Sequence, residues 1–181
     1  MTSTLPRVTH EHHERLMSHV DHLPAIGDLL LSAPIEELRP KLDEVDELLN
    51  QLLLPHLAAA EANLYPELER MLQNRHSLAP LRREHEAVRR RVAEFSSMRA
   101  AIDDHRPSVG QAVALRRVLY RLYALMKIHL VEEELYIRLI DRGVAPEAAE
   151  AIAAAMDHPV GVDAARSGGG PNPPDDPVRP A

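Results

Sequence analysis

The sequence predicts an all-α protein, an up-down four-helix bundle with a short extra helix near the C-terminus. Two observations favour this class. Apolar residues recur at steps of three and four over four long stretches, which is the period of an amphipathic helix. Strand signals are nearly absent, because the sequence has no run of alternating β-branched residues and no Asn-Gly or Asp-Gly hairpin turn. Long helices with short connections pack as antiparallel neighbours.

A third observation is that the two halves of the chain repeat one another. His13 and His56 have almost the same separation as His85 and His129. The second histidine of each pair begins a similar stretch, HLAAAE in the first half and HLVEEE in the second. A helical hairpin that occurs twice predicts four helices with one such histidine on each.

Local signals mark the ends of the four long helices. Pro24 and Gly27 bend or break the first helix. Pro80 suits the first turn of the third helix. Ser108, with Gln111 three residues later, is a capping-box signature for the fourth helix. The predicted helices cover residues 6–31, 34–73 (or 40–73), 77–102 and 108–143, with a turn at residues 103–107.

The C-terminal part of the chain is predicted from its composition. Pro146 begins a short helix with the sequence PEAAEAIAAAM. From about His158 the chain is rich in Gly and Pro and has no apolar stripe, which predicts disorder. We therefore assign residues 1–158 to the bundle and residues 159–181 to a disordered Pro/Gly-rich tail.

The composition excludes several classes of protein. The chain has 181 residues, which suits one domain, and 45% are hydrophobic, which is enough for a core. Because there are no cysteines, disulfides, thiolate metal sites and cysteine nucleophiles are excluded. A formal net charge of −7 argues against a nucleic-acid surface. The basic run at residues 82–91 is therefore interpreted as the solvated face of a helix.

Membrane insertion and secretion are not predicted. No stretch reaches about 18 uncharged apolar residues, the length that a membrane span requires. The N-terminal residues contain no apolar segment of the kind found in a secretory signal. We therefore expect a cytoplasmic protein.

One histidine lies on the apolar stripe of each long helix: His13, His56, His85 and His129. Burying a polar group without a partner costs roughly 1–3 kcal/mol. Four imidazoles in an aliphatic core are therefore expected to share a partner. Because neutral imidazole is the commonest metal ligand in proteins, we predict that the four converge on a metal site.

The remaining histidines and the tyrosines are given other roles. His10 lies one turn before His13 and is a weaker candidate ligand. Tyr65, Tyr123 and Tyr136 are expected to pack in the core, with the lining of a small-molecule pocket as the alternative. Surface or capping roles are predicted for His12, His19, His22, His76, His105 and His158.

Acidic side chains on the same helical faces would complete the site. Glu133 follows His129 by four residues and lies on the same face of its helix, with Glu134 as the alternate ligand. Imidazole and carboxylate ligands without sulfur suit non-haem iron, with manganese or zinc as alternatives. No histidine is preceded by Glu three residues earlier, so the Glu-x-x-His motif of ferritin-like carboxylate proteins is absent.

These residues and their contexts resemble the hemerythrin-like, HHE cation-binding family. The resemblance covers about residues 8–142. It is carried by His13, LLPHLAAAEANLYPEL (53–68), REHEAV (83–88) and LRRVLYRLYALMKIHLVEEELY (115–136). It implies a four-helix bundle with a non-haem di-iron centre, and therefore two irons per chain. It also implies that His13, His56, His85 and His129 are terminal ligands and that Glu133 is a bridging carboxylate.

One position departs from the family pattern. Ala60 stands four residues after His56, where the family has a ligand Glu. The nearest acid, Glu61, lies about 140° round a regular helix from His56. Because Pro55 removes a backbone donor, a π-bulge near it would widen the turn and swing Glu61 toward the core. We therefore assign Glu61 as a metal ligand by hypothesis, with a single metal or zinc as the alternative.

Three functions stay open at this point. The leading one is a protein that binds or senses O2 or a related small molecule at a di-iron site. The second is a di-iron enzyme that handles peroxide or nitric oxide, which the resemblance also covers. The third, suggested by Ala60, is a structural bundle with a degenerate single-metal or zinc site. No catalytic residue is predicted, and the sequence does not determine an oligomeric state.

Overall fold

The computed structural model describes residues 4–102 and 106–140, together with residues 150 and 154. All regular secondary structure in this part of the chain is helical. The α-helices are α1 (Thr4–Val20), α2 (Leu23–Leu29), α3 (Ile35–Leu48), α4 (Leu54–Ala59), α5 (Tyr65–Met71), α6 (Ala79–Ala100) and α7 (Val109–Ile140). Two π-helical turns, η1 (Leu49–Leu53) and η2 (Ala60–Leu64), join α3 to α4 and α4 to α5.

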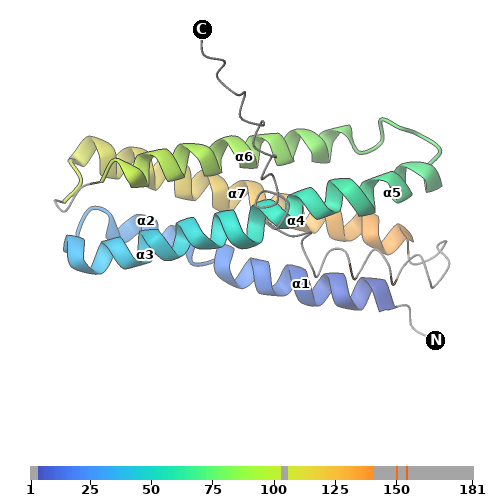
Figure 1. The fold of residues 1–181 in the computed structure, drawn as a ribbon, viewed down its shortest axis with the longest axis horizontal. Helices are drawn as coiled ribbons and strands as arrows, with labels where there is room; N and C mark the ends of the chain where they lie inside the picture. The colour runs from blue at the N-terminus through green and yellow to red at the C-terminus, as the bar shows by residue number, and fades with distance from the viewer. Residues whose placement is uncertain (1–3, 103–105, 141–149, 151–153, 155–181) are drawn as a thin grey trace, which may run out of the picture.

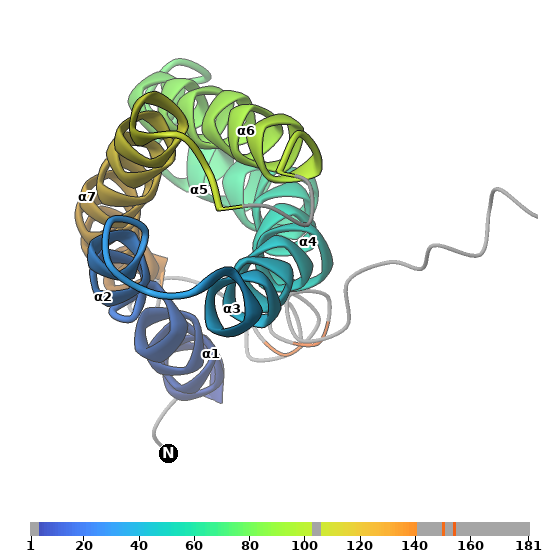
Figure 2. The same ribbon diagram turned by 90° about the vertical axis from the view of Figure 1, so that its left-hand side faces the viewer.

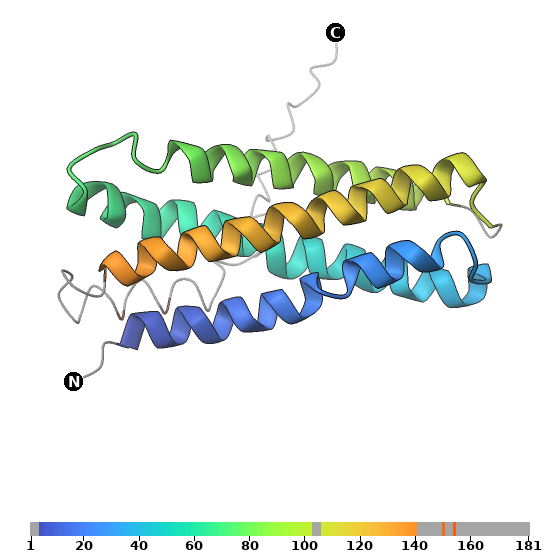
Figure 3. The ribbon, with the colours of Figure 1, turned by 180° about the vertical axis from the view of Figure 1, so that it is seen from behind.

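Four lengths of helix lie side by side along the long axis of the described part of the molecule. They are α1 with α2, the continuous run from α3 to α5, α6, and α7 (Figure 1). Seen from one end, the four surround a common interior (Figure 2). From behind, α7 lies between α6 and the α1–α2 length (Figure 3), and it packs against all three of these helices.

The first predicted helix is interrupted close to Pro24, as expected. A turn at Asp21 and His22 ends α1, and Pro24 lies in the first turn of α2. Gly27 does not break the helix but lies buried inside α2. A Cβ atom at this position would come within 3.2 Å of the Tyr120 ring, so glycine lets α2 approach α7 closely.

The second predicted helix is continuous from Ile35 to Met71 because two π-turns accommodate prolines. A proline inside a helix has no N–H to donate, and its ring clashes with the carbonyl group four residues earlier. For Pro55 that carbonyl lies in η1, and for Pro66 it lies in η2. Each π-turn has a backbone hydrogen bond that spans five residues and ends at the residue directly before the proline. Leu54 N–H donates to the carbonyl oxygen of Leu49, and Tyr65 N–H donates to that of Ala60. The predicted widening near Pro55 is therefore present in η1, and η2 is a second one.

The third and fourth predicted helices correspond to α6 and α7. The predicted capping box is confirmed, because the backbone N–H of Ser108 donates to Oε1 of Gln111 at 2.9 Å. In return the backbone N–H of Gln111 donates to Oγ of Ser108 at 3.3 Å. The predicted helix that begins at Pro146 and the predicted tail at 159–181 lie outside the described residues, apart from positions 150 and 154.

The core consists of two apolar clusters. The larger one is formed by side chains of α1, α2, α3, η1, α4 and α6 and by those of α7 from Ala112 to Leu130. The smaller one is formed by Ala60, Leu64, Tyr65, Leu68, Leu78, Leu81 and Ile137. Along α7, Glu133 falls between Leu130 of the larger cluster and Ile137 of the smaller one. The polar residues of the interior therefore lie between two apolar clusters.

None of the helices within the described ranges combines the length and the apolar character that crossing a membrane requires.

Candidate metal centre

Five buried polar side chains meet in the interior. They come from α1, α4, α6 and α7, and they are His13, His56, His85, His129 and Glu133. None is more than 5% exposed. Their ligand atoms form two groups of three, and within each group the atoms lie within 4.8 Å of one another. Glu133 belongs to both groups, one with the His13–His56 pair and one with the His85–His129 pair.

In the His85–His129 pair the two Nε2 atoms face each other at 3.0 Å. The Nδ1 atom of His85 lies 2.8 Å from Oε1 of Glu61, and Nδ1 of His129 lies 3.0 Å from Oε2 of Glu84. A carboxylate accepts a hydrogen bond from Nδ1–H, so each ring presents a lone pair at Nε2. Two such lone pairs at this distance repel one another unless a cation or a proton lies between them.

Burial keeps the rings of this pair neutral. Burial and the nearby His129 together lower the pKa of His85 from 6.5 to about 4, although Glu133 and Glu61 oppose the change. Burial also lowers the pKa of His129, although Glu133 opposes the change. At neutral pH both rings can therefore act as metal ligands without first losing a proton.

The His13–His56 pair is organised around one oxygen atom of Glu133. Nε2 of His13 lies 3.1 Å from Oε2 of Glu133, and Nε2 of His56 lies 3.3 Å from the same oxygen. Burial lowers the pKa of His13, but hydrogen bonds with Glu133 and Glu134 outweigh it and raise the value to about 9. Burial alone would raise the pKa of Glu133, yet hydrogen bonds from His13 and His56 hold it well below its usual range.

Several buried atoms at this pair have no hydrogen-bond partner among the described residues. They include Nδ1 of His56 and Oε1 of Glu133. A buried polar atom without a partner costs about 1–3 kcal/mol. This Oε1 atom belongs to Glu133, the residue that both groups share. A cation beside Glu133 would give this oxygen the partner that it lacks.

The donor set and its spacing fit a metal ion. Imidazole and carboxylate without sulfur suit iron, manganese or zinc. With bonds of about 2.1 Å, adjacent ligand atoms of an octahedral ion lie roughly 3.0 Å apart. The Nε2 atoms of His85 and His129 have this separation, and the contacts from Oε2 of Glu133 to His13 and His56 are close to it.

Glu61 occupies a different place from the one expected. It contacts Nδ1 of His85, which we call the outer nitrogen because Nε2 is the one that faces the other histidine of the pair. Glu61 does not belong to either group of three. Arg89 donates to both of its carboxylate oxygens, at 3.0 and 2.9 Å. Although burial would raise the pKa of Glu61, hydrogen bonds from Arg89 and His85 lower it overall. Glu61 is therefore an anion that orients the His85 ring.

Glu134 also lies outside both groups of three. Its Oε2 atom is 3.5 Å from Nδ1 of His13, and its side chain is 16% exposed. Glu133 is thus the acid that the structure places among the histidines, and Glu134 is an outer neighbour of His13. Outer carboxylates accordingly lie beside three of the four rings: His13, His85 and His129.

The fourth ring, His56, packs against another histidine. His12 stacks on it, with the ring centroids 4.9 Å apart and an angle of 25° between the planes. The predicted surface or capping role for His12 is wrong, because this residue is only 6% exposed. His12 immediately precedes His13, and the close packing of α1 against the interior buries both. The surface placement predicted for His19, His22 and His76 is confirmed.

His10, the weaker candidate, lies at the surface. Its side chain is 53% exposed, and Nε2 is 3.2 Å from Oε1 of Glu14. It contributes to a groove of about 350 Å³ between α1 and α7. His13 and Glu134 also line this groove, together with apolar side chains that include Met17. The His13–His56 pair is therefore reached from the surface between these two helices.

Sequence reasoning missed two further polar groups at the centre. Glu84 directly precedes His85, but its carboxylate reaches across to His129 on α7. The Tyr65 hydroxyl lies 2.9 Å from Nε2 of His85. Burial raises the pKa of Tyr65, and the negative charge of Glu133 raises it further. Tyr65 therefore packs in the core as expected, but it also carries a protonated hydroxyl into the centre.

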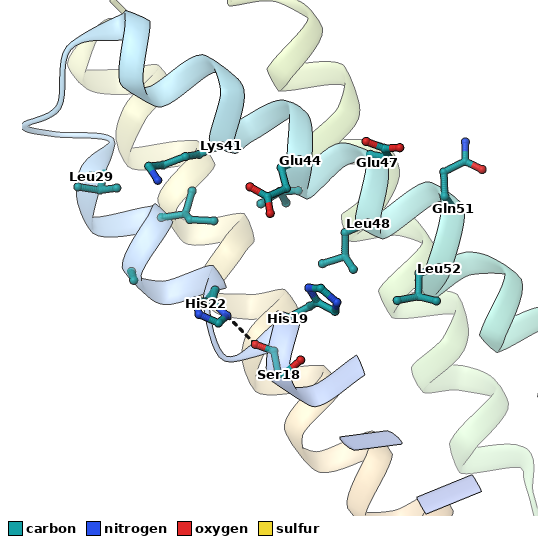
Figure 4. Close-up of a pocket in the computed structure, with 13 residues that line it drawn as sticks. Ser18, His19, His22, Leu29, Lys41, Glu44, Glu47, Leu48, Gln51 and Leu52 are labelled. Carbon is teal, nitrogen blue, oxygen red and sulfur yellow. Dashed lines mark hydrogen bonds between the residues drawn. The ribbon is translucent and has the colours of Figure 1, made fainter. Parts of the chain in front are cut away.

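A larger hollow, of about 680 Å³, lies elsewhere in the molecule (Figure 4). Side chains of α1, α2, α3 and η1 line it, among them Lys41 and Glu44. Within it, Nδ1 of His22 donates to the carbonyl oxygen of Ser18 at 2.6 Å. None of the five residues of the candidate centre lines this hollow. It is a separate feature of the surface.

Comparison with protein-family models, with curated proteins and with solved structures gives no match for this chain. A function is therefore inferred from the buried histidines and Glu133 themselves.

Proposed function

We propose that this protein is a hemerythrin-like, up-down four-helix bundle whose interior holds a non-haem di-iron centre that binds or senses O2 or a related small molecule. The observation that carries the proposal is the position of Glu133, which is shared by the two histidine pairs. A carboxylate between two metal ions about 3.5–4 Å apart is a common arrangement in such centres. Two ions would place opposite charge beside the buried anion.

In this proposal the ligands divide between two ions. His13 and His56 would hold one ion, His85 and His129 would hold the other, and Glu133 would contact both. Bound iron supplies reversible one-electron chemistry and coordination positions for a small ligand. The carboxylates of Glu61, Glu84 and Glu134 would set the ring orientations from outside, as hydrogen-bond partners of ligating histidines commonly do.

The surroundings favour binding of a small, weakly polar molecule. Two histidines and a shared carboxylate provide few protein ligands per ion, which leaves coordination positions open. The core on both sides is apolar. The groove between α1 and α7 would allow O2 or another diatomic molecule to approach from the side of His13.

The test is the metal content of the full-length chain after expression with iron available. We expect about two irons per chain, and a visible spectrum that changes reversibly when O2 is added and removed. His129→Ala should lose iron, whereas His22→Ala, which removes an exposed histidine outside the centre, should not. Protein without stoichiometric metal, whose melting temperature does not respond to a chelator, would contradict the proposal.

A single-metal centre at the His85–His129 pair is the second candidate. It is favoured because, of the two pairs, only this one has a carboxylate hydrogen-bonded to the outer nitrogen of each ring. Ala60 also supplies no carboxylate near the His13–His56 pair. One iron or one zinc per chain, lost in His85→Ala and retained in His13→Ala, would select this candidate.

A further inference from the structure

Tyr65 places an oxygen atom at the His85–His129 pair. The residue has no exposed surface, and its hydroxyl lies 2.9 Å from Nε2 of His85. This nitrogen also faces His129 and is the atom with which His85 would bind a metal. The 2.9 Å separation is close to the roughly 3.0 Å expected between adjacent ligand atoms of one octahedral ion.

The π-turn η2 explains how Tyr65 reaches the interior. Tyr65 follows His56 by nine residues, which on a regular helix would place the two about 180° apart. A π-turn takes up one extra residue, so the angle falls to roughly 80°. Because Pro66 directly follows Tyr65, the proline that requires the widened turn also determines where the tyrosine points.

Ala60 lies on the same helix and provides no ligand atom. It follows His56 by four residues, about 40° round the helix, and it is fully buried. Its methyl group cannot bind a metal. Glu61, the next acid, is held on the outer nitrogen of His85 by Arg89. The Tyr65 hydroxyl is therefore the oxygen that this helix brings to the inner side of the His85 ring.

We propose that the oxygen of Tyr65 is a ligand of iron(III) at the His85–His129 pair. The inference rests on the proposed metal centre. When the ion binds, the O–H bond of Tyr65 breaks, the proton passes to solvent, and an oxygen lone pair forms the bond to the metal. No electron is transferred in this step. Phenolate is a hard oxygen donor, which suits the higher oxidation state of iron.

The experiment uses the full chain loaded with iron(II) without oxygen, oxidised with ferricyanide and desalted. Iron per chain, visible absorption and resonance Raman spectra are then measured. We expect a phenolate-to-iron(III) charge-transfer band, and tyrosine ring vibrations enhanced by excitation within that band. Tyr65→Phe should abolish both while iron remains bound through the histidines. Tyr123→Phe, which removes a hydroxyl group outside the centre, should retain both.

The outcomes separate this inference from the proposed function. Wild-type protein that binds iron but shows no tyrosine signature overturns the role of Tyr65 and leaves the metal centre standing. Wild-type protein that binds no iron overturns both. Ring-deuterated tyrosine in the wild-type chain gives a second measurement that does not depend on the folding of a variant. The enhanced vibrations should shift, and unshifted vibrations would contradict tyrosine ligation.

Discussion

The His85–His129 pair and the His13–His56 pair use the same kind of ligand but are supported differently. Both outer nitrogens of the first-named pair contact a carboxylate, at 2.8 and 3.0 Å. In the other pair, His13 lies 3.5 Å from Glu134, and Nδ1 of His56 has no hydrogen-bond partner among the described residues. A hydrogen bond at Nδ1 fixes the tautomer and the orientation of the ring. The ring orientations of the His85–His129 pair are therefore fixed more fully than those of the His13–His56 pair.

The pairs also differ in charge. Burial holds the pKa of His85 at about 4, so this ring is neutral at pH 7. Hydrogen bonds with Glu133 and Glu134 outweigh burial and raise the pKa of His13 to about 9, so this ring is protonated at pH 7. A metal ion must displace a proton from His13 but not from His85. The two copies of the repeated motif therefore differ in protonation at pH 7: His85 is neutral and His13 carries a proton.

The largest effect is expected from Glu133, which joins the pairs. Glu133→Ala should remove metal binding from both and destabilise the metal-free protein by about 3–5 kcal/mol, because it removes the closer of the two carboxylates that face the buried His13 charge. Iron analysis and urea unfolding measure the two effects. The exposed Glu86 provides a control as Glu86→Ala. Retention of two irons in Glu133→Ala would show that Glu133 does not connect the pairs.

Removing one histidine from each pair tests their inequality directly. His13→Ala should leave one tightly bound ion per chain, because the His85–His129 pair keeps its ligands and its outer carboxylates. His85→Ala should leave only weak binding at the His13–His56 pair. Competition with a chelator of known affinity, followed by metal analysis, compares the two variants. The opposite order of affinities would mean that the outer hydrogen bonds do not determine which pair binds metal more strongly.

The free energy of unfolding of the metal-free protein should depend on pH through a histidine of each pair. Because the folded-state pKa of His13 is raised, its contribution to stability is complete below about pH 6.5 and is lost as the pH rises to about 9. The lowered pKa of His85 acts in the other direction, so stability falls as the pH drops from about 6.5 to about 4. Each limb amounts to at most about 3 kcal/mol. Urea unfolding at several pH values measures the curve.

The variant His13→Gln separates the two limbs of that curve. It should flatten the loss of stability above pH 6.5 and keep the part of the loss at acidic pH that comes from His85. In the wild-type protein, iron affinity of the His13–His56 pair should rise over the range in which stability falls, since both follow the same proton. A wild-type curve that is flat from pH 6.5 to 9 would contradict a charged His13.

The smallest effects should come from the outer carboxylates. Glu61→Gln and Glu84→Gln should each weaken metal binding at the His85–His129 pair by about 10–100-fold, as is typical for partners of ligating histidines. Glu134→Gln should have a smaller effect at the other pair, because its contact with His13 is longer. Dissociation constants from metal titration test this order. Equal effects of all three substitutions would remove the distinction between the pairs.

The local structure was largely predictable from the sequence. Helical periodicity, the capping box at Ser108 and the widened turn near Pro55 depend on residues within a few positions of one another. The same periodicity placed four histidines and Glu133 on the inner faces of their helices, where the structure also has them. A repeated motif carries this information because a fixed step along a helix corresponds to a fixed face.

Only the tertiary structure decided what surrounds each histidine. Arg89 on α6 holds Glu61 behind His85, and Glu84 reaches from α6 to His129 on α7. Tyr65 enters the centre through a π-turn, and His12 is buried against His56. These contacts depend on the register and rotation of one helix against another, which the period of a single helix does not contain. The sequence by itself therefore determined which histidines face the interior, and packing between helices made the two pairs unequal.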